Sequence, residues 1–123
     1  MANNKLAGDE GEDLAAEFLK RRGLKIIERN FRTRNGEIDI LAIDKREKEP
    51  ALVCIEVKTR SQSAFGTPLE SITYFKLKAL KRTLEMYKST HRGLPDSLRI
   101  DAVSVYKSPT GEVQIEHHEN IVD

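Results

Sequence analysis

Residues 36–58, GEIDILAIDKREKEPALVCIEVK, decide the fold because they contain two β-strand patterns separated by a charged turn. Residues 36–43 and 51–58 are rich in apolar and β-branched side chains, which favour strands. The intervening residues 44–50 are charged apart from the closing proline, which indicates a solvent-exposed connection. Residues 51–58 have the composition of a central strand. The segment therefore predicts two neighbouring strands of one sheet.

The remaining sequence places one helix before these strands and one after them. The first helix pattern stops at Gly23, a common helix end. The second has Pro68 at its first position, Thr67 as its cap and Glu70 completing a capping box. The expected helices cover residues 9–22 and 68–89, and the expected strands cover residues 25–31, 36–43, 51–58, 98–106 and 113–117. The order α-β-β-β-α-β-β predicts an α/β fold with a mixed β-sheet flanked by helices.

Length and composition limit the class of protein. The chain has 123 residues, near the usual size of one domain, so we expect a single domain over residues 1–123. We expect its core at residues 8–106, followed by a C-terminal strand and tail at residues 107–123. The single cysteine, Cys54, excludes an internal disulfide and a cysteine-based zinc site. No apolar run is long enough to cross a membrane and the first residues resemble no secretory signal, so we expect a soluble, cytoplasmic protein with no membrane partner.

The charges are nearly balanced in total but segregated along the chain. The formal net charge is +1, whereas residues 20–34 carry a net +6 and residues 76–92 a net +5. These two basic segments flank residues 35–75, which carry a net −2. Basic stripes are typical of proteins that bind a phosphate backbone. The same distribution also fits two ordinary solvated faces.

Two charged residues lie at the end of the central strand. Alternation along residues 51–58 places Glu56 and Lys58 on the same face as Leu52 and Cys54. Charges beside a buried strand are costly unless they are paired or bind a metal. The pair therefore predicts either a strand-end salt bridge or part of a functional site.

Asp39 lies in the middle of an apolar strand pattern, between two isoleucines. Aspartate is depleted in strands because it packs poorly and must be desolvated. We expect Ile38, Ile40 and Ala42 to share one face of this strand and Asp39 to lie on the other. A tight turn between the two strands brings Asp39 near Glu56. Carboxylate oxygens are hard ligands, so this pair favours Mg²⁺ or Mn²⁺ over zinc.

The first helix supplies a third candidate carboxylate. On a helical wheel, Glu12 falls within the apolar arc that contains Ala16 and Leu19. A carboxylate on the buried side of a helix needs a partner. One interpretation is a capping box, in which Asp9 caps the helix and Glu12 folds back on its first turn. The other is that Glu12 reaches a ligand at the edge of the sheet, and the two interpretations are compatible.

Asp39, Glu56 and Lys58, on two adjacent strands after a helix that bears Glu12, resemble the motif of the PD-(D/E)XK nuclease superfamily. The element order is also similar to its restriction-endonuclease-like core. Seven motifs in order resemble more closely the YraN family of small bacterial proteins, whose fold is similar to that of archaeal Holliday-junction resolvases. The motifs, which extend from about Gly8 to Val105, are Gly8-x-x-Gly11-Glu12-x-x-Ala15, Asn30-Phe31-Arg32, Gly36-Glu37-Ile38-Asp39, Glu56-Val57-Lys58-x-Arg60, Phe65-Gly66-x-Pro68, Lys76 and Arg99-x-Asp101. Ile38 stands where the superfamily name has proline.

The resemblance implies a metal-dependent endonuclease that hydrolyses DNA phosphodiester bonds, with branched or structured DNA as a candidate substrate. It implies that Asp39, Glu56 and the Val57 carbonyl bind Mg²⁺ or Mn²⁺, with Glu12 binding directly or through water. It assigns Lys58 to orienting the attacking water and stabilising charge at phosphorus. The phosphate contacts it implies are Arg29, Arg32, Arg34, Arg60 and Lys76. A two-fold homodimer is expected as well, because paired incisions need two sites.

A function of a different class fits the same residues: a nucleic-acid-binding or partner-binding module that keeps the nuclease fold without catalysis. The intact set of Asp39, Glu56 and Lys58 favours the enzyme over this module.

Several further residues are predicted to be structural. We expect Cys54 to pack in the core and Asp101 to pair with Arg99. We expect His117 and His118 to lie at the surface. The aromatic residues that fit either stacking on unpaired bases or packing in core and loops are Phe31, Phe65 and Tyr74.

Overall fold

The computed structural model describes residues 2–60 and 72–122, with side chains from residue 9 onward. Its elements in chain order are α1 (Ala2–Arg21), β1 (Leu24–Thr33), β2 (Gly36–Asp44), β3 (Ala51–Arg60), α2 (Tyr74–Thr90), β4 (Ser97–Lys107) and β5 (Val113–His118). The predicted order α-β-β-β-α-β-β and the α/β class are therefore confirmed.

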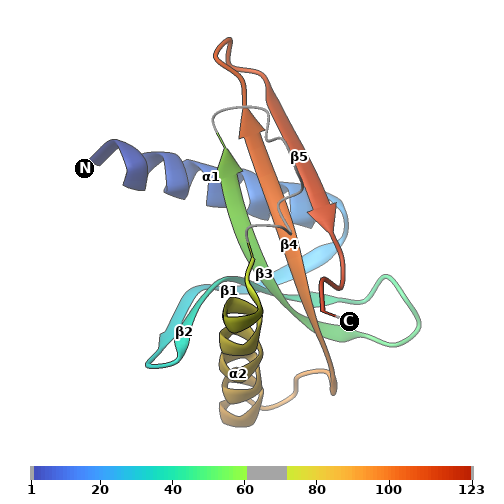
Figure 1. Cartoon of the computed structure of the whole chain (residues 1–123). Coiled ribbons are helices and arrows are strands. Elements are labelled where there is room, and N and C mark those ends of the chain that lie inside the picture. Colours follow the sequence, from blue (N-terminus) through green and yellow to red (C-terminus); the bar gives the residue numbers. More distant parts are fainter. Residues whose placement is uncertain (1, 61–71, 123) are drawn as a thin grey trace.

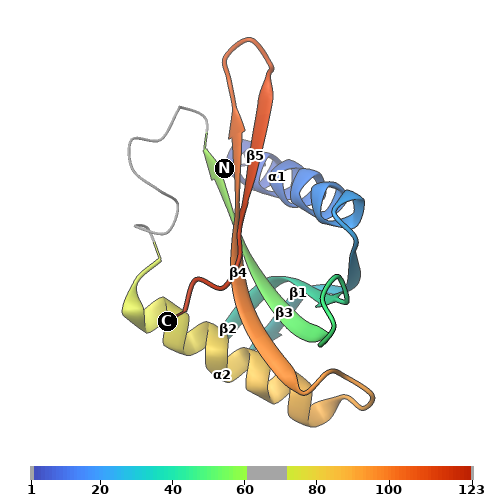
Figure 2. The ribbon, with the colours of Figure 1, turned by 90° about the vertical axis from the view of Figure 1, so that its right-hand side faces the viewer.

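The five described strands form one mixed sheet in the order β1-β2-β3-β4-β5. Neighbouring strands pair antiparallel except β3 and β4, which are parallel. A parallel pair needs a crossover, and α2 lies in the chain between these two strands. The two helices lie on opposite faces of the sheet, which is seen nearly edge-on in Figure 2, whereas Figure 1 shows β3, β4 and β5 side by side. Neither helix, over the part of the chain that the structure describes, is long and apolar enough to cross a membrane.

α1 is longer than the sequence pattern indicated. It begins at Ala2, so Asp9 lies inside the helix and is not its cap. The capping-box interpretation of Asp9 and Glu12 is therefore wrong. An N-cap residue lies at the start of a helix, where the residues before it are not helical. Here the residues before Asp9 are helical from Ala2 onward.

The start of α2 also differs from the prediction. The helix begins at Tyr74, and the Thr73 hydroxyl caps it by accepting a hydrogen bond from the Lys76 N–H at 3.1 Å. The predicted cap and capping-box residues, Thr67 and Glu70, lie outside the described residues. Thr73 satisfies the same physical requirement as the predicted cap, an acceptor for an unpaired amide of the first turn.

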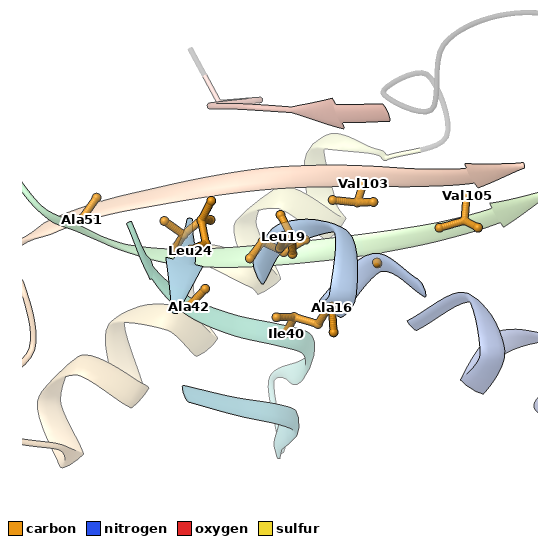
Figure 3. Close-up of a cluster of buried hydrophobic side chains, with 11 residues drawn as sticks. Ala16, Leu19, Leu24, Ile40, Ala42, Ala51, Val103 and Val105 are labelled. Atoms are coloured by element: carbon orange, nitrogen blue, oxygen red, sulfur yellow. The ribbon is translucent and has the colours of Figure 1, made fainter. Parts of the chain in front are cut away.

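The sheet separates two apolar cores, one under each helix. The α1-side core consists of Ala15, Ala16, Leu19, Leu24, Ile40, Ala42, Ala51, Val53, Ile55, Val103 and Val105. The α2-side core consists of Ile38, Leu41, Leu52, Cys54, Leu80, Leu84, Tyr87 and Ile100. Figure 3 shows Ala16 and Leu19 of α1 among side chains of the sheet in the α1-side core. Both faces of β3 are buried, as its apolar sequence predicts, and Cys54 is a core residue.

A cluster of ion pairs joins the C-terminal segment to the sheet. Asp101 is fully buried, and Arg99 donates two hydrogen bonds to it, each of 2.9 Å. Arg99 also binds Asp44 at 2.8 Å, and the Asn120 N–H donates to Asp101 at 2.9 Å. The predicted pairing of Asp101 with Arg99 is confirmed. His117 is buried and bonds Asp101 at 2.8 Å, so its predicted surface position is wrong.

Arginine and histidine side chains keep the buried carboxylates of Asp44 and Asp101 ionised. Hydrogen bonds from Arg46 hold the pKa of Asp44 well below its usual range. Burial acts to raise the pKa of Asp101, but hydrogen bonds from His117 and Arg99 hold it below the usual value. The cluster is therefore a satisfied network of the kind that supports a fold.

α1 lies very close to β3 at Gly11. A Cβ atom on Gly11 would overlap Thr59 Oγ1 and would lie 3.1 Å from Thr59 Cβ and 3.2 Å from Cγ2. Rotation of the threonine side chain cannot remove all three contacts, since Cβ does not move with it. Glycine at this position allows the helix to lie against the strand, and it places Glu12 over the same part of the sheet.

Gly11→Ala is expected to destabilise the protein by about 1–3 kcal/mol, because the added methyl group forces α1 away from β3. Helix propensity alone favours alanine by about 1 kcal/mol, so a net loss isolates the steric effect. Urea unfolding measures the difference. Thr59→Ala in the same chain removes two of the three close atoms and is expected to restore part of the stability, and equal stability of Gly11→Ala and wild type would contradict this close approach.

Candidate functional site

Asp39 lies where the pairing between β2 and β3 ends. The last residue pair of this antiparallel ladder is Ile40 with Ile55. Beyond it, Asp39 Oδ2 accepts a hydrogen bond from the Val57 N–H at 2.8 Å. The carboxylate thus binds an amide of β3 beyond the last residue pair of the ladder, and this bond fixes its position.

The side chains of β1 and β2 change from one face of the sheet to the other at the level of Asp39. Asn30, which lies opposite Asp39 in the register, has a left-handed φ of 57°. Beyond this point Phe31 and its partner Ile38 pack in the α2-side core, although Ile40 packs in the α1-side core. The prediction that Ile38 and Ile40 share a face is therefore wrong. A left-handed residue interrupts the alternation of a strand, and asparagine tolerates this conformation better than most residues.

Glu56 is the second carboxylate of the site and is only 4% exposed. It lies on the α2 side of β3, where Lys58 Nζ is 3.5 Å and Lys76 Nζ is 3.4 Å from its Oε2 atom. Lys58 follows it on the same strand, and Lys76 comes from the first turn of α2. The predicted salt bridge between Glu56 and Lys58 is present, and the structure adds a second ammonium group from the helix.

Glu12 reaches the site from α1 on the other side of the sheet. Arg29 Nη2 of β1 is 3.5 Å from its Oε1 atom, and Arg29 Nη1 is 2.8 Å from Asp13. With its amide oriented to donate, Asn30 is 3.1 Å from Glu12 Oε1 and 3.3 Å from Glu37 Oε1. The buried-side position of Glu12 is thus stabilised by neighbours on β1.

The carboxylates of Glu56 and Glu12 are close enough to Asp39 to affect its ionisation. Burial, together with the nearby carboxylates of Glu56 and Glu12, raises the pKa of Asp39 to about 7, although the hydrogen bond from the Val57 N–H opposes the shift. Burial also raises the pKa of Glu12 above its usual value, although Arg29 opposes the shift. Carboxylates with raised pKa values in one place hold unbalanced negative charge, which is typical of functional sites.

The oxygen donors present suit a hard divalent cation, and a cation would offset the repulsion at Asp39. Within residues 2–60 and 72–122, however, no group of three or more His, Cys, Asp and Glu side chains is placed to hold a metal ion. Asp39 and Glu56 are the two carboxylates nearest the ladder end, and the Val57 carbonyl remains a predicted third donor. Glu12 is engaged by Arg29 and Asn30, so its predicted metal contact, direct or through water, stays a prediction.

The predicted phosphate contacts occupy different environments. Arg29 is held by Glu12 and Asp13, and Arg32 Nε is 3.1 Å from Glu37 at the surface. Arg34 is exposed. Arg60 is half-buried, and its Nε has no hydrogen-bond partner among the described residues. The predicted motif at Phe65-Gly66-x-Pro68 lies outside the described residues.

Asn30 and the pairing of Lys76 with Glu56 were not predicted as parts of the site. Asn30 has a sequence signal, since asparagine within a strand pattern is unfavourable unless the backbone needs a special conformation. No sequence signal links Lys76 to Glu56, because the contact depends on where α2 lies across β3.

Residues 11–105 match the Uncharacterised protein family UPF0102. The chain belongs to this family. Similar UPF0102 proteins include those of Dictyoglomus turgidum, 40% identical over 90% of this chain and 91% of the relative, and Syntrophomonas wolfei, 42% identical over 93% and 95%. The UPF0102 protein of Alkaliphilus oremlandii is 42% identical over 95% of this chain and 97% of its own. The resemblance to the YraN family is therefore confirmed.

Asp39→Asn is expected to stabilise this UPF0102 protein above pH 7 and to leave it nearly unchanged at pH 4. The folded state binds a proton at Asp39 up to about pH 7, whereas an unfolded aspartate releases it near pH 4, so wild type loses stability as the pH rises between these values. Asparagine keeps an acceptor for the Val57 N–H without the charge. Urea unfolding in EDTA should show a gain of about 1–3 kcal/mol at pH 8.

Glu37→Gln is the matched control, because it removes a carboxylate of the same strand that pairs with Arg32 at the surface. This variant is expected to show no such gain at pH 8. Equal stability of Asp39→Asn and wild type at pH 8 would contradict the unbalanced charge at Asp39.

Proposed function

We propose that this protein is a metal-dependent endonuclease that hydrolyses phosphodiester bonds of DNA, with branched or structured DNA as its substrate. The observation that supports the proposal is the convergence of Asp39, Glu56 and Lys58 at the end of the β2–β3 ladder. These residues match the carboxylate and lysine positions of the PD-(D/E)XK motif that the sequence resembles. Asp39 is kept there at an electrostatic cost, which a purely structural strand end would avoid.

Asp39, Glu56 and the Val57 carbonyl would hold Mg²⁺ or Mn²⁺, with Glu12 contributing directly or through water. A divalent cation bound there supplies positive charge for the scissile phosphate and lowers the pKa of water. The Val57 hydrogen bond orients Asp39 before any ligand binds, so the position of this carboxylate is set by the strand and not by a mobile loop.

Lys58 and Lys76 supply the positive charge of the protein at this site. Their side chains are 28% and 42% exposed, so each ammonium group lies between the buried Glu56 and the surface. Lys58 would orient the attacking water and stabilise charge on the phosphate, and Lys76 would contact the phosphate beside it. Both roles follow from an ammonium group positioned next to a carboxylate that binds the cation.

The wider surface would bind the DNA backbone without selecting a sequence. Arg29, Arg32, Arg34 and Arg60 are the predicted contacts, and phosphate contacts of this kind position DNA but do not distinguish bases. Two copies acting as a dimer would allow paired cuts at a branch point. The cytoplasm, where a bacterial chromosome lies, is the compartment in which we expect the protein to act.

Wild type is expected to cut supercoiled, linear or four-way-junction DNA in Mg²⁺ or Mn²⁺ and not in EDTA. Asp39→Asn and Lys58→Ala are each expected to lower the cleavage rate about 100-fold or more, because the first removes a cation ligand and the second a positioned charge. Gel assays with each substrate measure the rate. Lys81→Ala, which removes an exposed lysine of α2 away from Glu56, is the matched control and should cut at close to the wild-type rate.

The outcome that contradicts the enzyme also identifies the alternative. If wild type and both variants bind DNA equally and none of them cuts any substrate with either metal, the protein is a nucleic-acid-binding module. The engagement of Glu12 by Arg29 and of Glu56 by two lysines is the observation that favours this second function.

A further inference from the structure

Two aromatic side chains at the start of α2 are strongly exposed. Tyr74 is 67% exposed and Phe75 is 80% exposed. Their rings pack edge to face, with centroids 5.7 Å apart and an interplanar angle of 73°. The helix packs on the sheet through other residues, which are Leu80, Thr83, Leu84 and Tyr87. The pair therefore contributes little to the α2-side core, and its exposure has no structural explanation within the described residues.

Positive charge surrounds these rings. Lys78 Nζ lies 5.2 Å from the centre of the Tyr74 ring, in the range of a cation–π contact. The neighbouring residue Lys76 extends toward Glu56, and residues 76–92 carry a net +5. An apolar protein surface would not be complementary to this charge. A polyanion with aromatic groups is complementary to both, because its negative groups attract the lysines and its aromatic groups can stack on the rings.

The rings are also adjacent to the candidate site. Phe75 is the chain neighbour of Lys76, whose Nζ is 3.4 Å from the buried Glu56. Consecutive Cα atoms are only about 3.8 Å apart, so a DNA strand bound on the rings lies beside the residue of α2 that contacts the site. The other aromatic candidate in the described part of the chain is placed differently, because Phe31 packs against Tyr87 with centroids 5.0 Å apart.

We propose that Tyr74 and Phe75 form a stacking platform for unpaired bases of a single-stranded DNA segment that leads into the site. This inference rests on the proposed function and narrows its substrate to DNA with a single-stranded part. Every base has a flat π face, so stacking on the rings does not depend on sequence, and Lys76 and Lys78 bind the phosphates between stacked bases. Bases inside a duplex are already stacked on one another and cannot occupy the platform.

Binding in EDTA tests the platform independently of cleavage. Fluorescence anisotropy compares an oligothymidine single strand with a blunt duplex of equal length. Tyr74→Ala and Phe75→Ala are each expected to weaken single-strand binding by about 5- to 100-fold, the range for loss of one base–aromatic stack. Duplex binding should change less than about twofold. Both side chains are exposed, so the variants are expected to keep the fold, which unfolding curves check.

Three variants separate ring stacking from general apolar contact. Phe75→Leu keeps an apolar side chain without a ring and is expected to weaken single-strand binding as alanine does. Phe75→Trp keeps a ring and is expected to bind the single strand as tightly as wild type or tighter. Met86, also on α2 and 41% exposed, gives the matched control Met86→Ala, which should not weaken binding.

The platform would be overturned if both alanine variants bound the single strand as tightly as wild type does. Equal loss of single-strand binding in Phe75→Trp and Met86→Ala would also overturn it. A change from dimer to monomer in Phe75→Ala, measured by sedimentation, would overturn it too and would assign the pair to a contact between two copies. The proposed function is judged separately by cleavage in metal. Cutting with ring-independent binding refutes only the platform, and ring-dependent binding without cutting refutes only the nuclease.

Discussion

The hydrogen bond from the Val57 N–H to Asp39 Oδ2 is the interaction on which the candidate site depends. It holds a carboxylate between two apolar cores, at the first residue of β2 beyond its ladder with β3. Because water is largely excluded there, the ionised form is disfavoured and the pKa rises. The carboxylate stays in place because the surrounding strands leave it no alternative position. Glu56, Glu12, Lys58 and Lys76 then lie around a carboxylate whose position is fixed.

The described part of the chain contains two groups of buried charges, and they differ in how the charge is balanced. Around Asp44 and Asp101, arginine side chains and a buried histidine satisfy the carboxylates, and the pKa values fall. Around Asp39, burial and the nearby carboxylates of Glu56 and Glu12 raise its pKa. The first arrangement supports the fold, since each charge has its partner. The second leaves negative charge that its neighbours do not fully offset, and this difference in electrostatics separates a structural network from a candidate site.

Local patterns predicted the secondary structure well where one physical signal dominated. The apolar run at residues 51–58 predicted the central strand, and its alternation correctly placed Glu56 on the same face as Cys54. Prediction failed where backbone geometry overrode the pattern. Ile38 changed face because the ribbon turns over opposite the left-handed Asn30, and alternation assumes that no residue does this. His117 was expected at the surface because it lies near the acidic C-terminus. Its burial depends on partners that lie 16 and 95 residues away in the chain, which local patterns do not reveal.

The sequence by itself determined the order of the elements, the two apolar faces of β3 and the identity of the charged residues that could bind a metal or a phosphate. These properties follow from composition and periodicity, which act over neighbouring residues. Only the tertiary structure decided which charges meet. Lys76 reaches Glu56 because α2 packs across β3, and Glu12 reaches the opposite side because Gly11 lets α1 lie against Thr59. Such contacts depend on how helices pack on a twisted sheet, and this packing is a property of the whole core and not of any local segment.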